Sequence, residues 1–342
     1  METRVVYLDI GKITINTEPL PKLGPNEVLV KTHQASVCGS ERYFYRGITV
    51  RPQDKARSTK DDHKYPLGPL GHEGGGIIVE IGPGAKEYVG GGKISEGDKV
   101  GIIAEPTYTD YWVFTPDCVQ PIPEGIPFEV GCLYEPLGCA AWAGLHTGVR
   151  PGDWVAVNGV GFAGNILMQG ARKLGASLII AIDVVDTKLD LAKKMGADIT
   201  INARVEDVVE RVNAITDREG VDVAIESAGG EGIGIVQSLG EVKHNGIIAL
   251  YGDNYAPVRD FSFHRFHEDG LSIRNLNPAH HTKLFMIDAF KQGFRAVKRA
   301  VYDVETVLEN SRKYRLEDLP DVFEKESSNL EGQESMKTMI YP

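Results

Sequence analysis

The amino-acid sequence predicts an α/β protein with two domains, one rich in short β-strands and one with a parallel sheet covered by helices. Three observations predict this fold class. The chain has 342 residues, a length typical of about two domains. Short strand patterns separated by turns dominate up to about residue 135. Beyond that point apolar strand runs alternate with amphipathic helix patterns, which is typical of a doubly wound parallel sheet.

The strands of the first half are runs rich in Val and Ile, bounded by Gly, Pro, Asn and Asp, the residues that form turns. Long helical periodicity is almost absent here, so we expect a β-rich domain. A stretch at 51–64 holds eight charged residues in fourteen and is expected to form a solvated loop. The expected strands of this half cover 26–37, 74–82 and 98–105.

In the second half, strand and helix patterns alternate from residue 153 to residue 252. The first two helix patterns end at a glycine, Gly175 and Gly196, which is a common way to end a helix. Strands are expected at 153–161, 177–185, 222–229 and 245–252, helices at 163–176, 186–197, 285–297 and 316–328, and a last strand at 337–342.

The composition excludes two classes of partner. The net charge is −11 and no run rich in Lys or Arg occurs, so the chain is not expected to bind nucleic acid. No apolar run reaches the roughly 18 residues that a membrane span needs, and residues 1–12 lack the apolar stretch of a signal peptide. Four cysteines without a CxxC pair suit a reducing compartment. We therefore expect a cytoplasmic protein.

The segment GVGFAG at 159–164 is a GxGxxG motif between a strand pattern and a helix pattern. In a dinucleotide site, Gly159 allows the tight turn and Gly161 lets the backbone approach a pyrophosphate. Gly164 allows the helix to pack closely against the strand. The alternative is that these glycines only serve a turn of an α/β fold.

The residues around this motif favour the dinucleotide site. Phe162 and Ala163 open the helix, whose free N–H groups and positive dipole end would face the phosphates. Asp183 ends the next strand, nineteen residues after Gly164, where a carboxylate can accept the ribose hydroxyls of NAD and repel the 2′-phosphate of NADP. Lys188 is a candidate contact on the adenosine side, or an exposed helix lysine. The motif predicts NAD in preference to NADP.

The first half contains candidate zinc ligands in Cys38, His72, Glu73 and Glu135. Thiolate, imidazole and carboxylate are the groups that zinc prefers, and three protein ligands with an open position are typical of a catalytic site. Each residue also has an ordinary structural interpretation. Cys38 can be a small buried side chain, His72 a core histidine and Glu135 a carboxylate at a helix start. Spacing alone leaves both interpretations open.

Considered together, these motifs resemble the zinc-dependent medium-chain dehydrogenases, closest in pattern to the polyol (sorbitol-type), threonine and glucose dehydrogenase branch. The resemblance covers nearly the whole chain. It rests on PNEVLVK at 25–31, CGS at 38–40, GHE at 71–73, GDKV at 97–100, EPLGCA at 135–140, the dinucleotide motif with Asp183, and VDVAIESAG at 221–229.

The resemblance implies a GroES-like catalytic domain, formed by 1–136 and 285–342, and a Rossmann NAD-binding domain at 137–284. It implies one catalytic zinc held by Cys38, His72 and Glu73. Glu135 would be a further ligand or would hold the zinc-bound water. Ser40 matches the hydroxyl that passes the substrate's proton toward solvent.

His72 and Glu73 are sequence neighbours, so both can reach one metal only if the backbone turns there. We expect the glycines at 74–76 to allow this turn.

The chain also departs from the family pattern. The four-cysteine lobe that binds a structural zinc in many relatives is missing after GDKV, so no structural zinc is expected. The usual CGSD is CGSE, with Glu41, and the histidine common three residues after Ser40 is Tyr43. The resemblance therefore does not imply a proton relay through residue 43.

The function expected from these features is oxidation of a secondary alcohol in a polyol, sugar, cyclitol or hydroxy-amino acid, with zinc and with NAD as hydride acceptor. The partners are a small alcohol or ketone and, by analogy with relatives, other copies of the chain in a dimer or tetramer. Two alternatives stay open. One is a metal-free NADPH-dependent enone or quinone reductase of the same fold, and the other is a non-catalytic nucleotide-binding relative. Both predict that the ligand set is not needed.

Overall fold

The structure is a computed structural model that describes residues 1–48, 65–255, 257–278, 282–328 and 334–342. The charged stretch expected to form a loop at 51–64 lies outside the described residues. The chain divides into two compact units. Unit 1 comprises Met1–Gly138, His281–Phe294 and Glu309–Pro342, and unit 2 comprises Cys139–His280 and Arg295–Leu308.

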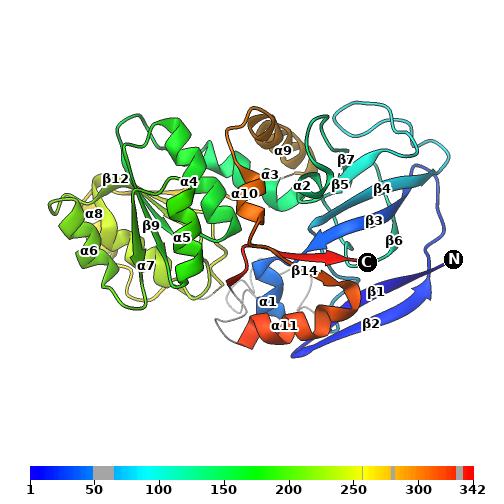
Figure 1. Ribbon diagram of the computed structural model, residues 1–342, viewed down its shortest axis with the longest axis horizontal. Helices are drawn as coiled ribbons and strands as arrows, with labels where there is room; N and C mark the ends of the chain where they lie inside the picture. The colour runs from blue at the N-terminus through cyan, green and yellow to red at the C-terminus, as the bar shows by residue number, and fades with distance from the viewer. Residues whose placement is uncertain (49–64, 256, 279–281, 329–333) are drawn as a thin grey trace. The chain divides into compact units, whose positions relative to one another are not determined.

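Unit 1 is built on a β-sheet, as the strand patterns of the first half predict (Figure 1). Its strands follow the order β14-β15-β3-β4-β5-β7, with β6 pairing β3, and β1 and β2 form a separate antiparallel hairpin. The strands are β1 (Glu2–Asp9), β2 (Lys12–Pro19), β3 (Val28–Ser36), β4 (Gly74–Ile81), β5 (Lys99–Ile102), β6 (Tyr111–Phe114), β7 (Val119–Pro121), β14 (Arg312–Arg315) and β15 (Thr338–Tyr341).

The helices of unit 1 lie in the connections and in the returning C-terminal segment. They are α1 (Gly39–Tyr45), α2 (Phe128–Gly131), the 3-10 turn η1 (Leu316–Asp318) and α11 (Leu319–Ser328). Two further helices, α3 (Tyr134–Gly144) and α9 (Lys283–Lys298), begin in unit 1 and end in unit 2.

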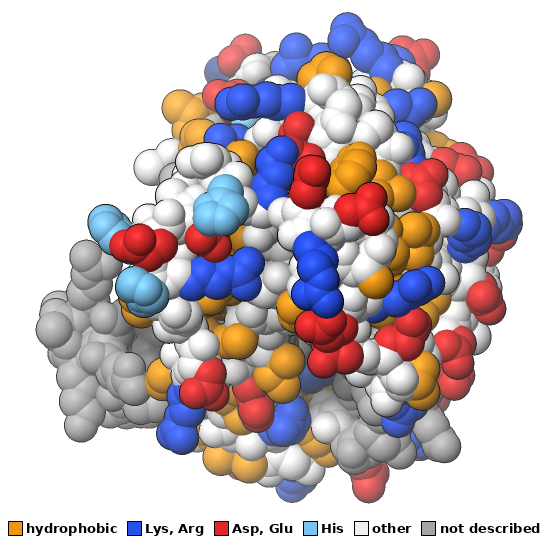
Figure 2. Space-filling model, turned by 90° about the vertical axis from the view of Figure 1, so that its left-hand side faces the viewer, with side chains coloured by type: hydrophobic (Ala, Val, Ile, Leu, Met, Phe, Trp, Pro, Cys, Tyr) orange, Lys and Arg blue, Asp and Glu red, His pale blue; other side chains and the backbone are white. Residues whose placement is uncertain are grey.

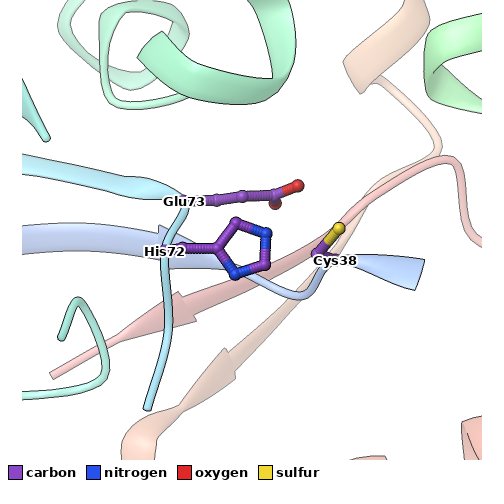
Figure 3. Close-up of side chains that lie close together, drawn as sticks. All are labelled: Cys38, His72 and Glu73. Carbon is purple, nitrogen blue, oxygen red and sulfur yellow. The ribbon is translucent and has the colours of Figure 1, made fainter. Parts of the chain in front are cut away.

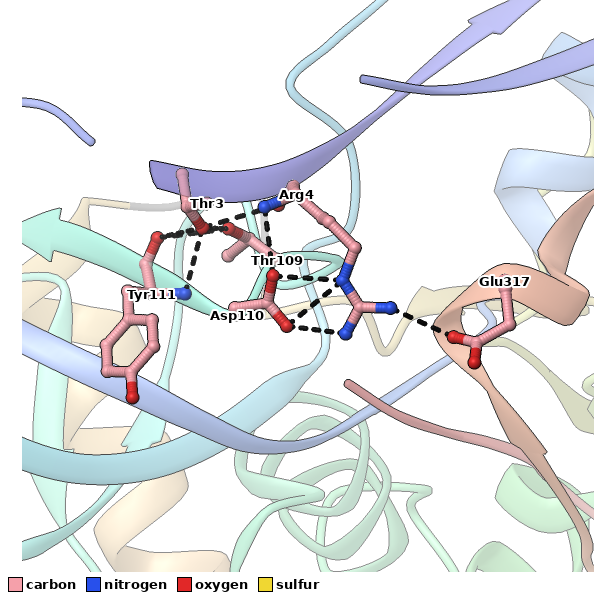
Figure 4. Close-up of polar contacts among 6 residues, drawn as sticks. All are labelled: Thr3, Arg4, Thr109, Asp110, Tyr111 and Glu317. Atoms are coloured by element: carbon pink, nitrogen blue, oxygen red, sulfur yellow. Dashed lines mark hydrogen bonds and ion pairs between the residues drawn. The ribbon is translucent and has the colours of Figure 1, made fainter. Parts of the chain in front are cut away.

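The hairpin is joined to the rest of unit 1 by Arg4 on β1 (Figure 4). Its guanidinium donates to Asp110, just before β6, with the shortest N–O distance at 2.6 Å, and to Glu317 of η1 at 2.9 Å. The backbone N–H of Arg4 also donates to Asp110 at 2.9 Å. Arg4 therefore connects three segments that are far apart in the sequence.

Unit 2 has a six-stranded parallel sheet in the order β10-β9-β8-β11-β12-β13. The order reverses between β8 and β11, which is the doubly wound arrangement that the alternating patterns predict. Its strands are β8 (Trp154–Asn158), β9 (Leu178–Asp183), β10 (Ile199–Asn202), β11 (Val221–Glu226), β12 (Val242–Leu250) and β13 (Ser272–Asn275). Its helices are α4 (Phe162–Leu174), α5 (Asp186–Lys194), α6 (Val208–Ile215), α7 (Ile233–Glu241), α8 (Phe263–Glu268) and α10 (Val304–Leu308).

The core of unit 2 lies on both faces of this sheet. Val155 and Val157 of β8 pack in one cluster of fully buried residues, and Ala156 between them packs in another. Successive side chains of a strand point to opposite faces, so a strand covered on both faces is apolar throughout. This explains why the strands of the second half appear in the sequence as continuous apolar runs.

The division between the units differs from the expected one, because the first boundary falls after Gly138 rather than after 136 and unit 1 resumes at His281 rather than at 285. The segment from 285 onward was expected to return to the β-rich domain, but residues 295–308 belong to unit 2. The hydroxyl of Tyr302 donates to the carbonyl of Ala141 at 2.7 Å, and the N–H of Asp303 donates to Gln169 at 2.7 Å. These long-range contacts cannot be inferred from the local pattern of the segment.

The surface agrees with the charge of the sequence. On the face shown in Figure 2, basic and acidic side chains are interspersed rather than gathered into a basic area. Ion pairs such as Lys243–Asp222 and Arg211–Glu206 belong to this kind of mixed surface. In the part of the chain that the structure describes, no helix is both long and apolar enough to cross a bilayer.

Candidate functional site

Three of the predicted zinc ligands converge in unit 1 (Figure 3). One side-chain donor atom each of Cys38, His72 and Glu73 lies within 4.8 Å of the other two. Cys38 lies two residues after the end of β3 and is the N-cap of α1, whereas His72 and Glu73 immediately precede β4. Because β3 and β4 pair in the sheet, residues 34 positions apart in the sequence meet at one point.

The turn that brings His72 and Glu73 to this point is not where the sequence suggests. The glycines at 74–76, expected to allow it, lie in regular strand β4, so that expectation is wrong. The residue with a positive φ is Gly71, at +97°. A Cβ there would lie 2.8 Å from the backbone nitrogen of Tyr108, so only glycine fits. The glycines of β4 instead allow close packing, since a Cβ on Gly75 would lie 2.8 Å from the Cα of Cys132.

The imidazole of His72 is oriented by Glu41, a buried carboxylate of α1. The Nδ1 atom of His72 lies 3.2 Å from Glu41 Oε1, which leaves Nε2 as the metal-facing nitrogen. The other oxygen of Glu41 accepts from the hydroxyl of Tyr108 at 2.6 Å and from the N–H of Cys38 at 3.2 Å. Burial lowers the pKa of His72, but the neighbouring Cys38 and Glu41 raise it well above its ordinary value.

The carboxylate of Glu73 is held by a buried lysine that the sequence did not single out. Lys337, just before β15, places its Nζ atom 2.6 Å from Glu73 Oε2, and the hydroxyl of Ser36 donates to the same oxygen. Burial raises the pKa of Glu73, but the ammonium of Lys337 and the imidazole of His72 lower it by more, so the pKa lies below its usual value. Glu73 is thus an ionised carboxylate in a buried position.

Two further predicted residues lie near this centre. The hydroxyl of Ser40 donates to the sulfur of Cys38 at 3.2 Å. Glu135 lies in the first turn of α3 and is not one of the three groups that converge. Burial lowers the pKa of Lys337, but Glu73 and Cys38 raise it above its ordinary value. The negative charge of Glu135 makes a smaller contribution that also raises this pKa. The structure therefore brings together three of the four predicted ligands.

The chemistry of these donors fits a zinc ion. A thiol sulfur, an imidazole nitrogen and a carboxylate oxygen are the ligand types of catalytic zinc sites. The imidazole is oriented by a carboxylate, as is usual for histidine ligands of metals. Cys38 and Glu73 also offer two negative charges when ionised, which would offset the charge of a divalent cation.

The glycine-rich segment of unit 2 lies between β8 and α4. Gly159 has a φ of +85°, and a Cβ on it would lie 2.8 Å from the Cα of Ala228. A Cβ on Gly164 would collide with the carbonyl oxygen of Gly159, so helix and strand could not pack as they do. A Cβ on Gly161 would meet no atom within 4 Å. The backbone at Gly161 is therefore open to a ligand.

The other predicted nucleotide residues surround this segment. Phe162 and Ala163 are the first two residues of α4, and Lys188 lies in the first turn of α5. The carboxylate of Asp183, at the end of β9, accepts from the N–H of Val160 at 2.9 Å and from that of Val184 at 2.8 Å. These bonds fix the carboxylate beside the glycine-rich segment, where a ribose would lie.

The residues that the sequence did not assign to the site are Lys337, Ser36 and Tyr108, and Glu41 was noted only as a departure from the family motif. A lysine directly before the apolar run TMI is a signal for Lys337, because a charge next to a buried strand needs a partner.

Comparison with known proteins gives a consistent result for both units. The family model described as "Alcohol dehydrogenase GroES-like domain" matches residues 24–124. The model described as "Zinc-binding dehydrogenase" matches residues 163–283. These two matches confirm the predicted fold of each half.

Individual relatives cover most of the chain. A sorbitol dehydrogenase from Bacillus subtilis is 29% identical, over 70% of this chain and 72% of its own. An L-threonine 3-dehydrogenase from Pyrococcus horikoshii is 32% identical, over 68% of this chain and 70% of its own. The crystal structure of 2R,3R-butanediol dehydrogenase from Bacillus subtilis superposes with a TM-score of 0.79 at 20% identity, with 99% of each chain covered.

Proposed function

The chain belongs to the zinc-type medium-chain dehydrogenase family, and from this membership we propose its reaction. The relatives described above include a sorbitol dehydrogenase and an L-threonine 3-dehydrogenase. We propose that it oxidises a secondary alcohol of a polyol, sugar, cyclitol or hydroxy-amino acid, with one zinc ion per chain and with NAD as the hydride acceptor. The observation that carries this proposal is the convergence of Cys38, His72 and Glu73 within 4.8 Å.

These three residues would hold the zinc. When bound, zinc supplies Lewis acidity that lowers the pKa of an alcohol hydroxyl. Glu41 Oε1 lies 3.2 Å from Nδ1 of His72, so the carboxylate faces that nitrogen and leaves Nε2 free for the metal. Lys337 and Ser36 fix the carboxylate of Glu73 and prevent it from rotating away. Glu135, in the first turn of α3, would orient a water or a substrate hydroxyl next to the metal.

Ser40 is the group proposed to move the substrate proton. Its hydroxyl is 3.2 Å from the sulfur of Cys38, so it lies beside a ligand atom and can both accept and donate a proton. The residue three positions later is Tyr43, not histidine. We therefore propose that the proton passes from Ser40 to solvent without a histidine relay.

The choice of NAD over NADP rests on Asp183. Its carboxylate is held beside the glycine-rich segment by three backbone N–H groups, at 2.8, 2.9 and 3.1 Å. A fixed negative charge there favours the two hydroxyls of an unsubstituted ribose and repels a 2′-phosphate. The redox chemistry belongs to the nicotinamide, and the protein supplies binding and orientation.

We also propose that the chain forms a dimer or tetramer in the cytoplasm. In the described part of unit 2, β13 is an edge strand and all four of its residues are exposed. The side chain of Ile273 in this strand is 44% exposed. An edge strand with free backbone groups and an apolar side chain can pair with another chain. The four cysteines, Cys38, Cys118, Cys132 and Cys139, are free thiols, which fits a reducing compartment.

The test is NADH formation by the purified protein with polyols, sugars, cyclitols, threonine and simple alcohols, each with and without a chelator. We expect turnover of a polyhydroxy or hydroxy-amino-acid substrate that the chelator abolishes. Turnover that persists with the chelator would contradict the metal mechanism. Reduction of enones with NADPH, without alcohol oxidation, would instead support the metal-free alternative.

A pair of cysteine variants tests the ligand assignment. Cys38→Ser is expected to lose bound zinc and turnover while retaining NADH binding. Cys118→Ser is the matched control, because Cys118 is a buried free thiol of the same unit that is not in the converging group. Equal zinc content in both variants would show that Cys38 is not a ligand.

A further inference from the structure

The segment VDVAIESAG contains a buried carboxylate that the proposed reaction does not use. Glu226 is the last residue of β11 and is 0% exposed. It forms none of the ion pairs found among the described residues. Burial raises its pKa, an effect that neighbouring hydrogen-bond donors offset in part. A buried carboxylate without a cation is costly and calls for a specific role.

The contacts of Glu226 join two loops. Its Oε1 atom accepts from the N–H groups of Ala228 at 3.0 Å and Gly229 at 2.8 Å, both in the loop between β11 and α7. Its Oε2 atom accepts from the side-chain nitrogen of Asn254 at 3.0 Å, in the loop after β12. Its backbone carbonyl accepts from the N–H of Tyr251, at the start of that second loop, at 2.8 Å.

The fit around this carboxylate is tight. A Cβ on Gly234 would lie 2.8 Å from Oε1, and a Cβ on Gly252 would lie 2.7 Å from Oε2. The two loops also bond to each other, since the N–H of Gly230 donates to the carbonyl of Asp253 at 2.8 Å. The glycines therefore leave room for the side chain of Glu226, whose hydrogen bonds connect both loops.

The place of these loops in the sheet indicates what they would bind. In a doubly wound sheet a dinucleotide lies across the carboxyl ends of the strands where the strand order reverses. Here β8, β9 and β10 form one half, which carries the glycine-rich segment and Asp183 on the adenosine side. The loops after β11 and β12 belong to the other half. By symmetry of the two halves, they face the nicotinamide side.

We propose that Glu226 is a positioning residue that fixes the loops 227–232 and 251–255 as the nicotinamide half of the nucleotide site. The proposal rests on the proposed function in requiring a nicotinamide dinucleotide as ligand. It assigns Glu226 no contact with the reacting atoms. Its effect is expected in binding of the nicotinamide half alone.

The test compares two probes, NADH and ADP-ribose, by isothermal titration calorimetry on the full chain without substrate. ADP-ribose contains the adenosine side and both phosphates but no nicotinamide. We expect Glu226→Ala to raise the Kd of NADH at least about tenfold, because the buried donors of Ala228, Gly229 and Asn254 lose their acceptor. We expect the Kd of ADP-ribose to change by less than about threefold. Glu226→Gln, which retains one accepting oxygen, is expected to give an intermediate loss.

Two results of this titration would overturn the proposed role of Glu226. Equal losses for both probes would mean that Glu226 only maintains the fold of unit 2, and no loss for NADH would also overturn the proposal. If Glu226→Ala does not fold, Asn254→Ala removes one of the three donors and is expected to weaken NADH but not ADP-ribose. Glu241→Gln, at another buried carboxylate of the same unit, is the control and should change neither Kd.

The outcome also separates this inference from the proposed function. A wild-type protein that binds NADH and shows the selective loss, but oxidises no alcohol, would contradict the proposed reaction and support the role of Glu226. If the wild type prefers NADPH, the same comparison uses NADPH and 2′-phospho-ADP-ribose. A wild type that binds neither coenzyme would contradict both proposals.

Discussion

Glu241 at the end of α7 predicts a pH-dependent stability that can be measured. Its carboxylate is fully buried and accepts from the side-chain nitrogen of Asn158 at 2.7 Å and from that of Gln237 at 3.1 Å. The ion pairs of the described residues do not include it. Burial raises the pKa of Glu241 from 4.5 to about 7, although both hydrogen bonds act to lower it. The perturbation that removes this titration is Glu241→Gln.

The sign and size follow from proton linkage. Between pH 4.5, the pKa of Glu241 in the unfolded chain, and about pH 7, its pKa in the native state, the native state binds more protons than the unfolded chain. The contribution of Glu241 to the free energy of unfolding is therefore fully present below about pH 4.5 and is lost as the pH rises through about 7. The two pKa values differ by about 2.5, which corresponds to about 3 kcal/mol at about 1.36 kcal/mol for each pH unit. Relative to wild type, Glu241→Gln should therefore gain up to about 3 kcal/mol between pH 5 and pH 8.

The assay is urea unfolding of wild type and Glu241→Gln at several pH values across this range. Trp142 and Trp154 lie in unit 2, so their fluorescence reports on its unfolding. Glu268→Gln is the matched control, because Glu268 is exposed on α8 of the same unit and should show no such trend. A stability difference between wild type and Glu241→Gln that stays constant with pH, or that changes in the opposite direction, would refute the reasoning.

Three further variants test other parts of the structure. Arg4→Ala should destabilise the protein by about 1–2 kcal/mol in urea unfolding, because it leaves Asp110, whose pKa Arg4 lowers, without its partner. An unchanged stability would mean that solvent replaces the bonds of Arg4. Glu41→Asp has a side chain one methylene shorter, so its carboxylate no longer orients His72. It should weaken zinc binding about tenfold in chelator competition, and an unchanged zinc affinity would contradict this role of Glu41. Asp183→Ala should raise the Kd of NADH far more than that of NADPH in fluorescence titrations, whereas equal losses would exclude the ribose contact.

The nucleotide-binding half was largely predictable from the sequence. Its strands are continuous apolar runs because helices cover both faces of the sheet, and its helices show a separate 3.6-residue periodicity. The positive φ of Gly159 and the close approach at Gly164 are local requirements that only glycine meets, so they leave a mark in the sequence. The hairpin formed by β1 and β2 was not identified from the sequence, and the contacts of Arg4 that join it to the rest of unit 1 are long-range.

The candidate metal site shows the opposite balance. The sequence predicted the ligand types, through motifs at Cys38 and His72 that resemble those of a known family. Only the tertiary structure shows which groups meet, because the pairing of β3 with β4 brings Cys38 and His72, 34 positions apart, together and because the turn lies at Gly71 rather than in the glycines that follow. It likewise placed Lys337 from the last strand against Glu73. Such pairings depend on long-range packing, which local sequence patterns do not encode, whereas a glycine turn or an apolar strand depends on its own few residues.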